Sequence, residues 1–81
     1  MIYKTKGTCS REIEVDVEDG IVKNVVFHGG CHGNLQGISR LVAGMSADRV
    51  IELLEGIKCG RKDTSCPDQL AKALRALGPR A

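Results

Sequence analysis

Hydrophobic and acidic residues alternate along residues 11–18 of the chain with a period of two. The apolar positions of this segment are Ile13, Val15 and Val17. A period of two predicts a strand with one buried face and one solvated face. The Asp19-Gly20 pair that follows is typical of a tight two-residue hairpin, so residues 21–28 are expected to form the returning strand. Its expected inward-facing residues are Ile21, Val25 and Phe27.

After Gly33 the apolar residues recur every three or four positions, which is the spacing of a helix with one buried face. We expect one helix that stops near Gly44, a second that Ser46 caps, and a third that begins within residues 64–68. The proline in that last segment suits a helix start, because its missing N–H would have no partner there. The expected buried residues are Leu35, Ile38, Leu41 and Val42 in the first helix, Val50, Ile51, Leu53, Leu54 and Ile57 in the second, and Leu70, Ala73, Leu74 and Leu77 in the third. Gly78 and Pro79 are expected to end the chain's last helix.

Residues 2–7 read as one more strand, so the predicted order is three strands followed by three helices. This order predicts an α+β fold in which a three-stranded antiparallel meander packs against helices as a two-layer sandwich. A chain of 81 residues is short enough to form one domain, which we place at residues 1–81. The core of such a domain is small, and domains of this size often depend on a metal, on disulfides or on a partner.

Composition excludes several classes of function. The net charge is only +2 and the charges of both signs are interspersed, which argues against a nucleic-acid surface. Tyr3 and Phe27, the two aromatic residues, cannot form a platform for base stacking. No apolar run approaches the ~20 residues of a membrane span. The N-terminal residues lack the hydrophobic segment of a signal peptide, so we expect a cytoplasmic protein in which thiols stay reduced.

The four cysteines fall where one predicted element gives way to the next; they are Cys9, Cys31, Cys59 and Cys66. In an antiparallel meander, the turn after the first strand and the end of the third strand lie at the same edge of the sheet. Cys9 and Cys31 are therefore expected at one end of the molecule. Cys59 and Cys66 flank the loop before the third helix, and the short antiparallel helices return the chain toward that end. Convergence of all four is therefore expected from the topology.

Four convergent thiolates form a tetrahedral soft-ligand site, which suits Zn²⁺ or an iron–sulfur cluster. Glycines beside Cys31 and Cys59 favour this interpretation, since tight metal-binding loops need positive φ angles. His32 and Asp68 are additional candidate ligands. Zinc is the first candidate, and the cluster is the second.

Other interpretations remain open at this stage. A single cysteine is more often a small buried hydrophobic residue than a ligand. Cysteines at helix starts favour the thiolate form, so Cys59 and Cys66 could instead exchange as a dithiol–disulfide pair in a metal-free redox or sulfur-handling protein. The glycine-rich turn before the first helix could bind an anion, a nucleotide or a flavin through its backbone N–H groups. The residues of that candidate site are Gly29, Gly30, Gly33 and Asn34.

Residues 64–68 read Thr-Ser-Cys-Pro-Asp, the motif for which the TSCPD domain family is named. Residues 26–35, 41–44, 57–60 and 68–71 also resemble that family, so the resemblance covers nearly the whole chain. The chain is similar to the short stand-alone members. The same domain occurs at the C-terminus of adenosylcobalamin-dependent ribonucleotide reductases, which implies an accessory role and a reductase as a partner. Catalysis of that reaction needs a large barrel, a radical cysteine and cobalamin, which 81 residues cannot contain.

The predicted layout also resembles that of the IscU/NifU-type iron–sulfur scaffolds. These proteins have a three-stranded meander followed by helices, with cysteines at the first hairpin, after the third strand and at the start of a late helix. Cys9, Cys31 and Cys66 match those three positions, whereas Cys59 has no counterpart there. The resemblance implies a convergent site that holds zinc or a cluster, and iron–sulfur or sulfur-transfer proteins as partners. It does not imply cluster assembly, because the partner-recognition motif of the scaffolds is missing.

Overall fold

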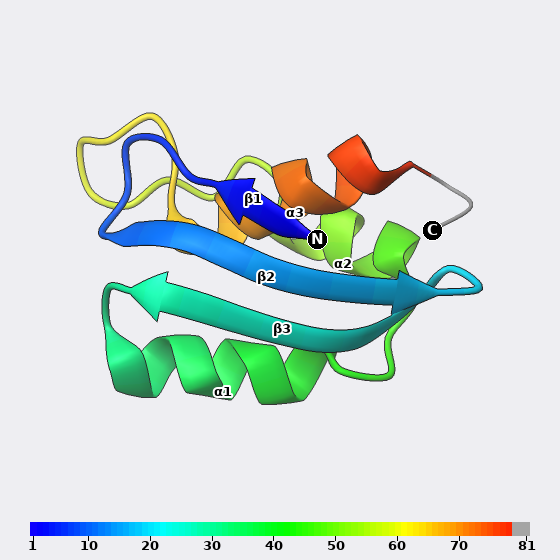
Figure 1. Cartoon of the computed structure of the whole chain (residues 1–81). Coiled ribbons are helices and arrows are strands. Elements are labelled where there is room, and N and C mark those ends of the chain that lie inside the picture. The colour runs from blue at the N-terminus through cyan, green and yellow to red at the C-terminus, as the bar shows by residue number, and fades with distance from the viewer. Residues whose placement is uncertain (79–81) are drawn as a thin grey trace.

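The computed structural model describes residues 1–78, in which three antiparallel strands are followed by three helices (Figure 1). The strands are β1 (Ile2–Lys4), β2 (Ser10–Glu18) and β3 (Ile21–Gly29), and the helices are α1 (His32–Val42), α2 (Ala47–Leu54) and α3 (Cys66–Leu77). The strand order in the sheet is β1-β2-β3. The predicted α+β order is therefore confirmed. The last three residues of the predicted domain, 79–81, lie outside the described residues, and Pro79 is one of them.

The hairpin between β2 and β3 turns at Asp19 and Gly20, whose φ angles of 53° and 77° are both positive, as a type I′ turn requires. The pairing register changes between Asp16 and Val17, where β3 has one extra residue. This bulge moves the start of β3 by one position relative to the core face. As a result Val22 is completely buried and Ile21 is only partly buried, so the expectation for Ile21 was wrong.

The core lies between the sheet and the helices (Figure 1). It contains Ile13, Val15, Val22, Val25, Val42, Val50, Leu70, Ala73 and Leu74. Helix α1 packs against β3, α3 packs against β2, and α2 packs against α3. Two layers built from alternating strand residues and helix stripes bury the apolar residues of both, as the sequence pattern predicted.

Three residues of the predicted helix stripes are instead exposed. Leu41 is 76% exposed, Leu53 is 48% exposed and Ile57 is 41% exposed. Leu35 and Val42 fix the inward face of α1, and Leu41 lies roughly a quarter of a turn away from that face. Helix α2 ends at Leu54, so Ile57 lies beyond the helix in a loop.

Three connecting segments gather at one end of the sheet, on the left in Figure 1. They are the turn between β1 and β2, the link from β3 to α1, and the loop from α2 to α3. Each of these segments contains or adjoins a cysteine. In the described residues, no helix is both long enough and apolar enough to cross a membrane.

Candidate metal centre: a pocket lined by four cysteines

All four cysteines line a single pocket of about 240 Å³. Cys9 ends the turn between β1 and β2, Cys31 is the N-cap residue of α1, Cys59 lies in the loop between α2 and α3, and Cys66 is the first residue of α3. All four are free thiols; Cys66 is partly buried, and the other three are exposed. The structure thus brings together four sulfur-bearing residues from four separate segments of the chain.

The remaining walls of this cysteine pocket are mostly apolar. Leu35 and Ile38 of α1 and Pro67 of α3 contribute its hydrocarbon surface. Thr8, Asn34, Lys62 and Ser65 also line it. An apolar wall lowers the local dielectric and strengthens the interaction of a thiolate with a cation.

Two glycines allow the link between β3 and α1 to approach the turn that carries Cys9. Gly29 and Gly30 have φ angles of 89° and 80°. A Cβ atom on Gly30 would lie 2.9 Å from Leu35 Cδ1 and 3.3 Å from the backbone nitrogen of Ser10. These two glycines therefore allow the close packing that sets Cys31 beside Cys9. This packing is a structural reason for glycine at two positions that the sequence offered as part of an anion site. Of the other two residues of that candidate site, Asn34 lines the cysteine pocket, and Gly33 has open space around it.

Polar groups surround two of the four sulfurs. Lys62 Nζ lies 3.8 Å from Cys9 Sγ, within reach of a hydrogen bond to sulfur. The Ser10 hydroxyl lies 3.2 Å from Cys66 Sγ, and Thr8 Oγ1 lies 3.2 Å from Ser10 Oγ. A cation thus contacts the sulfur of Cys9, and a hydroxyl group contacts the sulfur of Cys66.

The family model of the TSCPD domain matches residues 1–77. The chain belongs to the TSCPD domain family. No curated protein and no solved structure matches the chain.

The serine of the TSCPD motif fixes the start of α3. Ser65 is the N-cap residue: its hydroxyl oxygen accepts from the Asp68 backbone N–H at 3.1 Å. The same hydroxyl donates to the carbonyl of Ile57 at 2.7 Å. One side chain thereby caps the helix and ties it to the loop that carries Cys59.

The aspartate of the motif holds that loop from the other side. Asp68 is almost completely buried, and its carboxylate accepts hydrogen bonds from the Thr64 hydroxyl and, at 2.7 Å, from the Gly56 backbone N–H. Lys72 Nζ lies 3.3 Å from the same carboxylate. The Thr64 hydroxyl lowers the pKa of Asp68 most strongly, burial acts in the opposite direction, and Gly56 and Lys72 lower the pKa further. Asp68 is thus a fixed anion that organises the loop.

Backbone contacts complete the turn around Cys59. The N–H of Cys59 donates to the carbonyl of Thr64 at 3.1 Å, and its carbonyl accepts from the N–H of Lys62 at 3.0 Å. Gln69 donates to the Thr64 hydroxyl at 2.9 Å and accepts from the Lys6 N–H at 3.2 Å. The motif threonine therefore connects the Cys59 loop to the N-terminal part of the chain.

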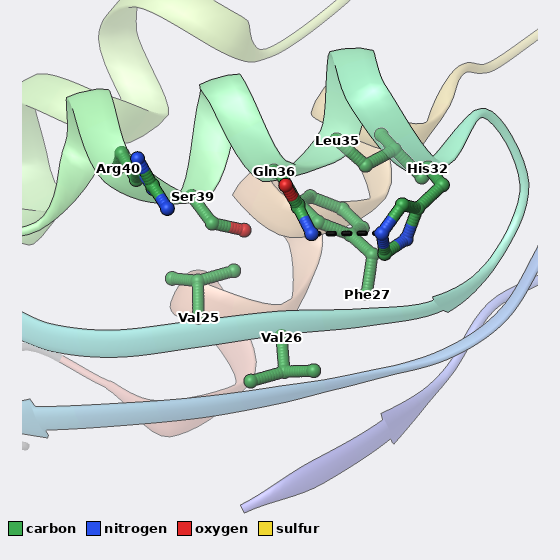
Figure 2. A pocket seen from close by; sticks show the side chains of 8 residues that line it. All are labelled: Val25, Val26, Phe27, His32, Leu35, Gln36, Ser39 and Arg40. Carbon is green, nitrogen blue, oxygen red and sulfur yellow. Dashed lines mark hydrogen bonds between the residues drawn. The ribbon is translucent and has the colours of Figure 1, made fainter.

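The two additional candidate ligands lie outside the pocket lining. Asp68 is engaged by the contacts above, and His32 faces a different pocket between β3 and α1 (Figure 2). His32 Nε2 lies 2.8 Å from Gln36 Nε2 in that second pocket. Of the candidate ligands that the sequence offered, the four cysteines are therefore the ones that line the cysteine pocket.

The chemistry of the four thiols fits Zn²⁺ or an iron–sulfur cluster, both of which prefer thiolate ligands. Among residues 1–78, no three His, Cys, Asp or Glu side chains form a group that could hold a metal ion. The four thiols thus line one pocket, but they are not arranged around a common centre as the ligands of a bound metal ion would be.

Sequence reasoning missed the contributions of Ser10 and Lys62 to the surroundings of the sulfurs. Ser10 reaches Cys66 across 56 positions of sequence, which no local pattern indicates. Lys62 belongs to a run of charged loop residues that looks like an ordinary solvated segment. The hydrogen bonds of the Thr64 hydroxyl and the Asp68 carboxylate were also missed. The sequence signal here is a serine at position 65 followed three positions later by an acidic residue, which marks a helix start but does not indicate these contacts.

Proposed function

We propose that this TSCPD domain binds a metal centre through the thiolates of its four cysteines, with Zn²⁺ as the first candidate and an iron–sulfur cluster as the second. The observation that carries the proposal is that all four free thiols line one pocket. Cysteines that only filled a small core would be buried, whereas three of these four are exposed.

The small size of the domain supports the proposal. Its core contains no residue larger than leucine or isoleucine among the completely buried side chains. Structural zinc sites supply about 10–16 kcal/mol of apparent binding free energy, which becomes folding free energy when the site forms only in the folded state. A metal that links the β1–β2 turn, the start of α1 and the start of α3 would join the three parts of the structure at one end.

In this proposal, metal binding draws the four sulfurs closer around one centre. The segment best suited to move is the loop that carries Cys59, because residues 55–63 are all exposed. The start of this loop is held by the contacts of Ile57 with Ser65 and of Gly56 with Asp68, and its end is held by the Thr64–Asp68 hydrogen bond, so the motion is confined to the loop. The open pocket also leaves room for a centre larger than one ion, which is why the cluster stays the second candidate.

Elemental analysis of protein purified without oxygen tests the proposal. We expect one equivalent of zinc, or iron with acid-labile sulfide and a visible absorption band. Cobalt substitution at a site with four thiolates gives intense charge-transfer bands, and each Cys→Ser variant is expected to weaken them. Ser39→Ala serves as the control, because Ser39 lies outside the cysteine pocket. Protein that is folded, reduced and unable to take up zinc, cobalt or a cluster would overturn the proposal.

A second candidate function is metal-free thiol chemistry, and the ammonium group of Lys62 near Cys9 favours it. Exposed thiols next to a cation react readily with disulfides and other soft electrophiles. Alkylation of the metal-free protein across a pH series, with mass spectrometry to identify each thiol, tests this candidate. A reversible disulfide between Cys59 and Cys66, together with an absence of metal, would favour it over the metal site.

A further inference from the structure

A second pocket, of about 300 Å³, lies between β3 and α1 (Figure 2). Residues 25–27 of β3 form one wall, and α1 forms the other with His32, Gln36, Ser39 and Arg40. Leu35 lines both this pocket and the cysteine pocket. None of the four cysteines lines the second pocket, so its ligand chemistry is independent of the thiols.

The polar residues of this pocket share one side of α1. Positions 32, 36, 39 and 40 are spaced by four, three and one, which is the spacing of one helical face. Figure 2 shows their side chains on the side of α1 that faces β3, near Val25, Val26 and Phe27. Polar groups on a helix thus converge over an apolar strand.

Arg40 supplies the only full positive charge among the residues that line this pocket. Within residues 1–78 it takes part in none of the ion pairs, whereas Arg49 pairs with Glu52 and Arg75 pairs with Glu55. No carboxylate is among the lining residues. A guanidinium group with no ion-pair partner in the described part of the chain, next to a half-buried hydroxyl at Ser39, is suited to bind a phosphate or carboxylate group.

The rest of the pocket is suited to a flat ring. Phe27 and Val25 point from β3 toward α1 and offer apolar surface, whereas the side chain of Val26 points away from α1 (Figure 2). The contact between His32 and Gln36 orients the Gln36 amide, whose donor and acceptor atoms can bind the edge of a heterocycle. The cavity volume of about 300 Å³ is at the lower end of the range for small-molecule sites. A ligand with one ring system and one anionic group therefore fits this pocket better than a dinucleotide does.

We propose that this pocket binds a small organic anion, namely a flat heterocycle that carries one phosphate group, of the size of a nucleoside monophosphate. Arg40 and Ser39 bind the phosphate, Phe27 and Val25 contact the ring, and Gln36 binds the ring edge. This site lies on α1 and β3, and it differs from the glycine-rich turn that the sequence offered for anions.

Titration of the ¹⁵N-labelled, reduced protein tests the proposal, with AMP, UMP, inorganic phosphate and adenosine as separate probes. We expect a nucleoside monophosphate to shift the amide signals of residues 25–27 and 32–40. Phosphate alone and adenosine alone are each expected to bind at least about tenfold more weakly, because each makes only part of the contacts. Equal affinity for phosphate alone, shifts that cluster at residues 29–31 instead, or no shifts at millimolar concentration would each overturn the proposal.

Substitutions test whether the ligand binds in this pocket and not elsewhere on the surface. Arg40→Ala is expected to weaken binding about tenfold or more, since it removes a charge-assisted contact. Arg49→Ala is the matched control, because Arg49 lies on α2 away from the pocket, and it is expected to leave affinity unchanged. Gln36→Ala is a second variant, on an exposed helix position where folding is preserved. Wild-type affinity in both Arg40→Ala and Gln36→Ala would overturn the proposal.

Discussion

The hydroxyl of Ser10 lies 3.2 Å from the sulfur of Cys66, although 56 positions separate the two residues in the chain. Ser10 begins β2 and is 3% exposed, and Cys66 begins α3. The contact joins the cysteine-bearing end of the sheet to the TSCPD motif. It also sets a buried polar group beside a sulfur that we propose as a metal ligand.

Ser10→Ala is expected to weaken metal binding without unfolding the domain. A hydrogen bond to a ligand sulfur orients it and tunes its charge, and loss of such a contact typically lowers metal affinity by about 10–100-fold. Competition against a chelating dye measures the change, and far-UV circular dichroism checks the fold. Ser39→Ala is the comparison variant, since Ser39 lies in the other pocket. Equal zinc affinities for the two variants would contradict a supporting role for Ser10.

Lys62→Gln is expected to slow the alkylation of Cys9 in the metal-free protein. The ammonium group lies 3.8 Å from the sulfur, so its positive charge attracts the electron density of the sulfur that reacts with the alkylating agent. Both groups are exposed, so the effect should be severalfold and should shrink as salt is added. Lys58→Gln is the control, because Lys58 belongs to the same loop but does not line the pocket. A rate constant that is the same in both variants would show that Lys62 does not act on Cys9.

Asp68→Asn is expected to destabilise the domain by about 2–3 kcal/mol, because a buried carboxylate that accepts several hydrogen bonds is replaced by an amide that cannot accept them all. The partners of the carboxylate are the Thr64 hydroxyl, the Gly56 N–H and the ammonium group of Lys72. Urea unfolding at neutral pH measures the change in unfolding free energy. Asp63→Asn, at an exposed loop position, is expected to change it little.

The same carboxylate makes stability depend on pH. Because the pKa of Asp68 is lowered in the folded state, chiefly by the Thr64 hydroxyl, the unfolded chain takes up a proton first as the pH falls. The stabilisation is complete above the ordinary carboxyl pKa of about 4 and is lost as the pH falls below it toward the folded-state pKa. The advantage of the wild type over Asp68→Asn should therefore shrink over the pH range below about 4. A constant difference across that range would contradict this role.

Much of the fold is contained in local sequence patterns. The structure contains the hairpin turn at Asp19 and Gly20, the alternating strand around Val15 and the helix cap at Ser46, each where the local pattern predicted it. At other positions, contacts between elements decided which residues are buried. A bulge moved Val22 into the core in place of Ile21, and the packing direction of α1 left Leu41 in solvent. A bulge depends on pairing with a second strand, and a helix face depends on its neighbour, so neither can be read from one segment alone.

The candidate site, too, could be predicted from the sequence only in part. The connectivity of a meander indicated that Cys9 and Cys31 lie at one end of the sheet, and the structure has both in the cysteine pocket. Their role as metal ligands stays a prediction. Ser10, Lys62 and the hydrogen bonds of Asp68 could not be predicted, because each depends on side chains that meet only after the loop before α3 has folded.

Two glycine-to-alanine substitutions three positions apart are expected to act in opposite directions. At Gly30, φ is 80° and a Cβ atom would lie 2.9 Å from Leu35 Cδ1 and 3.3 Å from the Ser10 nitrogen. Gly30→Ala should therefore lower the unfolding free energy by at least about 1–2 kcal/mol, the cost of a left-handed conformation for a residue with a Cβ atom.

Gly33 lies in the first turn of α1 with open space around it, so Gly33→Ala should raise the unfolding free energy by up to about 1 kcal/mol through helix propensity. Chemical denaturation of the metal-free proteins measures both changes. Since the conformation of Gly30 sets Cys31 against the Cys9 turn, Gly30→Ala should also weaken zinc binding, whereas Gly33→Ala should not. If both variants bound zinc as tightly as the wild type, the approach of these two segments would be irrelevant to the metal centre.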